Sequence, residues 1–224
     1  MTTKYPLDRF LDAQMEAWGR QDLKKKSPRV GPVVAVTREP GCDGESIAQT
    51  LADELGLVLY DWEIVKQIAK DAQVSEQVVA TLDEKHRSEL EEWLTDFAGG
   101  VGLSEYQYLQ SLRKVLFTVA AHGNAIIVGR AANFLLPPEK KTLGLCLVAP
   151  LDVRVKNIMQ KLHVSQEDAR KNIASTEREH RLLIKEIGRA DIGDATNYHI
   201  VINTALITPK TIVQIVKEIL KAKS

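Results

Sequence analysis

The sequence lacks an excess of charge of either sign, because its 30 Lys and Arg residues are balanced by 30 Asp and Glu residues. Without a net field, the chain has no general attraction to DNA, RNA or an anionic membrane surface. Any affinity for phosphate therefore has to be local. We predict small-molecule partners, and neither a nucleic acid nor a membrane.

Cysteines and long apolar runs are also scarce. The two cysteines, Cys42 and Cys146, are too few for a disulfide framework or a zinc site, which fits a reducing compartment. No segment approaches the run of about eighteen apolar residues that a membrane span needs, and the first residues lack the apolar core of an export signal. We expect a soluble, cytoplasmic protein.

Short apolar runs rich in β-branched residues are present instead, and segments of helical periodicity separate them. With 44% hydrophobic residues, the 224-residue chain can form a sizeable core. Strands that alternate with helices predict an α/β fold in three layers, with helices on both faces of a parallel sheet. The five predicted strands lie at 33–36, 57–60, 124–129, 143–150 and 198–204.

The predicted organisation has an appendage, a main domain and an insertion. Apolar residues at helical spacing predict a helix over 6–20, and a lysine-rich linker follows it, so residues 1–30 form an N-terminal helix and linker. Residues 31–224 form the main domain. Within it, residues 75–122 have a helical pattern broken at 98–105, which predicts a helical insertion over about 62–122.

The segment between the first strand and the next helix has the layout of a phosphate-binding loop. In the P-loop pattern G-x-x-x-x-G-K-[ST], backbone amides and a lysine hold phosphates while the hydroxyl binds magnesium. With Ser46 at the hydroxyl position, Gly44 matches the second glycine and Glu45 stands where the lysine should be. The amides of the turn and of the first helical turn remain available without that lysine. The predicted phosphate-binding residues are Gly41, Cys42, Asp43, Gly44, Glu45 and Ser46, with Ser46 as the magnesium ligand; the alternative is a simple connecting turn.

Two arginines are the nearest replacements for the missing positive charge. Asp43 and Glu45 would repel a polyphosphate unless they point outward or act through a metal ion. Arg38 ends the first strand and Arg130 follows the third, and the carboxyl ends of parallel strands converge on the crevice that binds ligands. Guanidinium groups there can clamp phosphate oxygens. The alternative is that each arginine is a surface salt-bridge partner.

Four segments of the chain carry a resemblance to a known family, namely VVAVTREPGCDGESIAQTLADELGLVLYDWEIV, GNAIIVGRAANFLL, LCLVAPLDVRVKNI and YHIVINTALIT. Together they resemble the cytidylate kinase-like family, which consists of nucleoside monophosphate kinases with a P-loop fold. The resemblance runs from about Val33 to the C-terminus, and that family is similar in having a strand-Arg-Glu-x-Gly-x-x-Gly loop without the usual lysine. It implies ATP- and Mg²⁺-dependent phosphoryl transfer to CMP or dCMP.

The resemblance also implies roles for residues outside the loop. Arg130 matches a residue that contacts the acceptor phosphate. Arg178 and Arg181 lie where the family places a lid, over about 165–195, and Arg154 on the preceding helix is a weaker candidate. Asp61, after the second strand, is either an acceptor contact or only a helix cap. The insertion at 62–122 would then be an acceptor-binding flap that closes over the substrate.

Two other functions remain open from the sequence. The loop departs from the more usual family pattern by carrying Cys42, Asp43 and Glu45. A P-loop protein of this kind could bind a nucleotide, or none, and act as a regulatory module without turnover. It could also be a kinase for another small acceptor.

Overall fold

The computed structural model describes most of the chain, and it divides the chain into two compact units. One unit comprises Met1–Gly31 and Glu63–Gly123, and the other comprises Pro32–Trp62 and Asn124–Ser224. Of the predicted N-terminal helix, residues 13–18 are helical and the remainder lies outside the described residues. The described residues are 13–18, 31–61, 65, 68–69, 72–95, 103–129, 131–136, 142–187 and 190–222.

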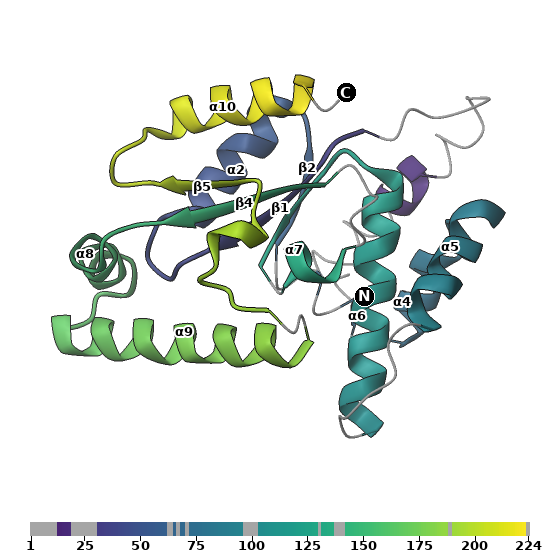
Figure 1. Ribbon diagram of the computed structural model, residues 1–224, viewed down its shortest axis with the longest axis horizontal. Coiled ribbons are helices and arrows are strands. Elements are labelled where there is room, and N and C mark those ends of the chain that lie inside the picture. Colours follow the sequence, from purple (N-terminus) through teal and green to yellow (C-terminus); the bar gives the residue numbers. More distant parts are fainter. Residues whose placement is uncertain are drawn as a thin grey trace, which may run out of the picture. The chain divides into compact units, whose positions relative to one another are not determined.

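The second unit is built on a parallel sheet of five strands in the order β2-β3-β1-β4-β5 (Figure 1). β1 pairs with β3 on one side and with β4 on the other, so the carboxyl end of β1 lies at the point where the chain switches sides. The predicted five-stranded parallel sheet is confirmed. The strands are β1 (Val33–Arg38), β2 (Val58–Tyr60), β3 (Ala125–Val128), β4 (Thr142–Val148) and β5 (Ile200–Asn203).

Except for β1, the strands are shorter than the apolar runs that predict them, although β4 begins one residue before its predicted start, at Thr142. Asn124 precedes β3 with a positive φ of 52°, which takes it out of the extended region. Pro150 caps the helix after β4, and a short 3₁₀ helix, η1 (Ala195–Asn197), precedes β5. The apolar residues at these ends therefore fill turns and caps as well as strands.

Helices α2 (Gly44–Leu55) and α10 (Pro209–Ala222) lie together along one face of this sheet, as Figure 1 shows. Their apolar faces bury Ile47, Leu51, Ile212 and Val216 against the sheet, as the helical periodicity predicts. On the other side, α7 (Ala132–Leu135) contacts β1. α8 (Leu151–Leu162) and α9 (Gln166–Ile187) pack on each other through a small apolar cluster of their own.

The first unit is helical, with α4 (Ala72–Val79), α5 (Glu84–Thr95) and α6 (Leu103–His122). Its core includes Leu82, Leu90, Phe117 and Ala121. α6 begins at Leu103, so the predicted break at 98–105 extends too far, while residues 96–102 lie outside the described part. In the described part of the chain, no helix combines the length and the apolarity that crossing a membrane requires.

His122, at the end of α6, makes the stability of this unit depend on pH. Burial is the main cause that lowers the pKa of its imidazole from 6.5 to about 4, and the ring stacks on Trp18 with centroids 4.3 Å apart. The unfolded chain binds the proton with the higher pKa, so falling pH favours unfolding. Between about pH 7.5 and about pH 5, we expect wild type to lose about 2 kcal/mol more unfolding free energy than His122→Phe. Urea unfolding of both proteins measures this; equal losses would contradict it.

Candidate active site

The loop after β1 makes a tight, strained turn into α2. Gly41 has a φ of 84° and Asp43 a φ of 60°, so the chain enters the helix through two left-handed residues. α2 begins directly after this turn, at Gly44. The first intrahelical bond runs from the Ile47 amide to the Asp43 carbonyl at 3.1 Å, which leaves the amides of the first turn without an intrahelical acceptor.

Cys42 belongs to the scaffold of this turn. Its amide donates to the Glu39 carbonyl at 3.3 Å, and its buried thiol donates to the Leu147 carbonyl at 3.5 Å. Burial raises the pKa of the thiol to about 11, so the thiol stays protonated near neutral pH. The amide and the thiol of Cys42 are thus engaged in holding the loop, and its predicted contact with phosphate stays a prediction.

Arg38 lies between two glycines at the end of β1. A Cβ on Gly129 would come within 2.8 Å of the Arg38 guanidinium, and a Cβ on Gly44 within 2.8 Å of the Arg38 Cβ. The Nη2 atom of Arg38 is 3.8 Å from the Glu45 carboxylate, and the side chain is 19% exposed. The absence of side chains at these two glycines therefore leaves room for Arg38 beside the loop.

The loop and Arg38 open onto a cleft of about 710 Å³. This volume lies within the range of about 300–1,000 Å³ that is typical of small-molecule sites. Most of the loop lines this cleft, namely Arg38–Gly41 and Asp43–Glu45. Its other wall is polar and comes from α8 and α9, with Asn157, Lys161, Thr176 and His180 among its residues.

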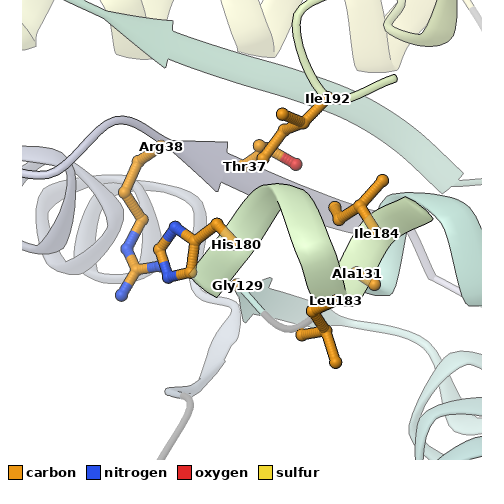
Figure 2. A pocket seen from close by; sticks show the side chains of 8 residues that line it. All are labelled: Thr37, Arg38, Gly129, Ala131, His180, Leu183, Ile184 and Ile192. Carbon is orange, nitrogen blue, oxygen red and sulfur yellow. The ribbon is translucent and has the colours of Figure 1, made fainter. Parts of the chain in front are cut away.

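A second, smaller pocket begins at the same arginine. Figure 2 shows Arg38 and His180 pointing toward the same part of this pocket, with Thr37, Ile184 and Ile192 to one side of them. His180 also lines the large cleft and a third cavity of about 360 Å³ at the ends of β4 and β5. The single turn of α9 that carries His180 thus borders all three spaces.

An ion-pair network fixes α8 and α9 beneath the loop. The buried Arg154 guanidinium lies 3.4 Å from Glu39 and 2.7 Å from Glu177, and it donates to the Ala149 carbonyl at 2.9 Å. Glu39 also accepts a hydrogen bond from the Ala149 amide at 3.0 Å. Because the Nε and Nη1 atoms of Arg154 are engaged in these contacts, we infer that its role is to join the loop to the two helices.

Removing Arg154 should be costly for this reason. We expect Arg154→Met to lower the unfolding free energy by about 2 kcal/mol, because it leaves two half-buried carboxylates without their partner. The matched control is Arg170→Met, which replaces an exposed arginine on α9 and should change stability by less than about 0.5 kcal/mol. Urea unfolding measures both; similar losses in the two variants would contradict the network role.

Comparison with known proteins identifies the family. The model of the cytidylate kinase-like family matches residues 33–206, most of the chain. The chain belongs to this family. The sequence resemblance and the α/β, P-loop kinase-like fold that it implies are therefore both confirmed.

Cytidylate kinase-like relatives align with the chain at low identity. The cytidylate kinase of Ignicoccus hospitalis is 24% identical over 189 residues, which cover 84% of this chain and 98% of the relative. The cytidylate kinase of Pyrococcus horikoshii is 29% identical, over 53% of this chain and 65% of that relative. A crystal structure of an uncharacterized protein from Eubacterium ventriosum has a TM-score of 0.58 at 16% identity, over 84% and 98% of the two chains, and supports the fold alone.

The other predicted site residues of this cytidylate kinase-like chain lie in different places. Arg181 lines the third cavity and is 3.5 Å from Glu177, whereas Arg178 is exposed on α9 outside the lining of the three cavities. Ser46 is exposed in the first turn of α2. Asp61 is exposed directly after β2, and the predicted helix that it would cap begins in undescribed residues. Arg130 also lies outside the described residues.

Sequence reasoning missed the polar residues of the cleft wall, among them Asn157, Lys161 and His180. Asn157 and Lys161 are one turn apart on α8, and His180 is on α9. Asn157 donates to the Gly41 carbonyl at 2.8 Å, and Lys161 donates to the Glu45 carboxylate. The only signal in the sequence was a polar face on an amphipathic helix, which ordinarily faces solvent. The contact depends on how α8 packs, which helical periodicity does not specify.

Proposed function

We propose that the protein transfers the γ-phosphoryl group of ATP to a nucleoside monophosphate, with CMP or dCMP as the acceptor. Family membership supports a nucleotide kinase, and the two relatives described above are cytidylate kinases, which supports a cytosine acceptor. The observation that carries the proposal is the large cleft, where the loop after β1, Arg38, α8 and α9 meet.

The donor phosphates would bind at the start of α2. The amides of Gly44, Glu45 and Ser46 are in the first turn of this helix, where amides have no intrahelical acceptor and the helix dipole favours an anion. Gly41 and Asp43 supply the left-handed turn that leads into it. We therefore keep Gly41 and Asp43–Ser46 as the proposed phosphate site, with Cys42 supporting the turn from below.

Magnesium fits this site as a partner of the donor rather than as a resident metal. Among the residues that the structure describes, no three His, Cys, Asp or Glu side chains form a metal-binding group. Mg²⁺ usually takes one or two protein oxygens and completes its shell with phosphates and water. The exposed Ser46 hydroxyl would hold it, and when bound the ion would neutralise charge on the phosphate oxygens.

Arg38 would stabilise the transferred group. An oxygen of the acceptor phosphate attacks the γ-phosphorus, the bond from that phosphorus to the bridging oxygen breaks, and ADP leaves. The reaction demands positioning and positive charge more than covalent chemistry. Arg38 lies directly before the loop and borders the cleft, which supports this role.

The acceptor site and the lid complete the proposal. We propose that Arg130 and Asp61 contact the acceptor, that residues 62–122 cover it, and that the region of about 165–195 closes over the donor with Arg178 and Arg181. Arg181 borders a cavity next to the loop, which supports its role in the lid. Arg178 does not line that cavity, so its position supports the same role less directly. Closure would exclude water from the transferred group.

One assay tests the function. Purified protein is incubated with MgATP and, separately, with CMP, dCMP, UMP, AMP or GMP, and ADP formation is followed with a coupled enzyme. We expect ADP to form only when an acceptor is present, with the fastest rates for CMP and dCMP. Transfer to a different acceptor would replace the cytidylate assignment. Saturable MgATP binding without turnover on any acceptor would favour a regulatory nucleotide-binding protein, which the acidic side chains of Asp43 and Glu45 could also suit.

A further inference from the structure

Helix α8 brings two side chains to the loop from outside it. Asn157 and Lys161 are separated by four residues, so they lie on one face of the helix. The Asn157 amide donates to the Gly41 carbonyl at 2.8 Å, which fixes this face of α8 against the turn. Lys161 then lies one helical turn further along the same face, and its ammonium group reaches the loop as well.

The ammonium group of Lys161 is bonded to the residue that replaces the loop lysine. It donates to Oε2 of Glu45, at the sequence position where a standard loop carries its lysine. This hydrogen bond is the main cause that lowers the pKa of the Glu45 carboxyl, with a smaller contribution from Arg38. Glu45 is therefore ionised, and a positive charge is held beside the phosphate loop in spite of the missing lysine.

We propose that Lys161 supplies the cation that binds the donor phosphates and that Glu45 positions it; this inference rests on the proposed function. An ammonium group has three donors, so Lys161 can keep its bond to Glu45 while it donates to a phosphate oxygen. The cation that the loop itself lacks is thus provided by a neighbouring helix across the cleft.

Stability alone does not account for this pair. Both side chains are 62% exposed, and an exposed ion pair contributes little to stability. Both nevertheless line the large cleft, together with Arg38. The pair also joins α2 to α8 across the opening of the loop, which is where a triphosphate needs positive charge.

The first experiment removes the ammonium group. We expect Lys161→Met to weaken the binding of MgATP, and of inorganic tripolyphosphate, by about tenfold in calorimetric titrations. The matched control is Lys156→Met, which replaces an exposed lysine of the same helix that does not line the cleft. Its affinity should equal that of wild type. Circular dichroism and the melting temperature check that each variant is folded.

The second experiment moves the charge. In the Lys161→Met background, Glu45→Lys places an ammonium group at the standard loop position, while Glu45→Gln only removes the acid. We expect Glu45→Lys to restore MgATP affinity to within about threefold of wild type, and Glu45→Gln to restore it less. Equal recovery in the two double variants would overturn the inference, since removing the acid would then explain the whole effect.

Failure of the inference differs from failure of the proposed function. If wild type and Lys156→Met bind MgATP and Lys161→Met binds it equally well, the role of Lys161 is overturned and the function stands. If wild type itself has no affinity for MgATP or tripolyphosphate, the proposed function fails and the inference fails with it.

Discussion

Replacing Arg38 with Ala is expected to lower the rate of phosphoryl transfer by about 100-fold or more, because a group that stabilises developing charge typically contributes that much. Arg38 is the last residue of β1, at the carboxyl end of this central strand, where the loop begins. Gly44 and Gly129 leave space for its side chain. Its loss should affect turnover more than folding, because its ion pair with Glu45 is long at 3.8 Å. Steady-state ADP formation measures the effect.

Two variants make this result specific. Arg38→Lys keeps the charge without the planar fork of donors, so it should recover only part of the rate. Arg170→Ala removes an exposed arginine on α9, outside the lining of the cleft, and should turn over like wild type. An Arg38→Ala protein with full activity would take Arg38 out of the proposed site.

Replacing Gly41 with Ala is expected to lower the unfolding free energy by about 3 kcal/mol and to abolish measurable MgATP binding. Gly41 has a φ of 84°, and a Cβ there would lie 2.6 Å from the Arg154 carbonyl oxygen. The obstacle is backbone at the start of α8, which Asn157 and Arg154 also fasten to the loop. The turn has to distort, because the atoms nearest to the added Cβ all belong to the backbone of Arg154 and not to a flexible side chain.

Gly56→Ala is the matched control for strain alone. Gly56 ends α2 with a φ of 63°, yet no atom lies within 4 Å of an added Cβ. Its substitution should cost about 1 kcal/mol and leave MgATP binding unchanged. Similar costs for the two variants in urea unfolding, with binding retained in Gly41→Ala, would contradict the close packing of loop and α8.

The sheet was predictable because its signal is local. The three central strands, β1, β3 and β4, are short runs of mostly buried apolar residues, and such runs are nearly continuously apolar when both faces of the sheet are covered. The loop was predictable for the same reason, since it follows directly after β1 and opens α2. The ends of the strands were less predictable. Asn124 lies in a turn and Pro150 caps a helix, although the apolar runs continue up to both residues.

The wall of the cleft was not predictable, because it depends on packing between distant segments. Lys161 and Glu45 are 116 residues apart, and no periodicity in either helix indicates that they meet. Arginine is a residue type that often binds phosphate, but the contacts of the buried Arg154 with Glu39 and Glu177 give it a structural role. Cys42 likewise sits within the loop sequence while its thiol and amide face the protein.

The central claim is that main-chain amides at the start of α2, helped by Arg38 and Lys161, bind the triphosphate of ATP without a loop lysine. The most direct measurement is a titration of ¹⁵N-labelled protein with MgATP, followed through the amide resonances of the chain. We expect saturable shifts concentrated at Gly44, Glu45 and Ser46, and smaller shifts on the far side of the sheet. Saturable binding that leaves these three amides unmoved, or no binding at all, would contradict the claim.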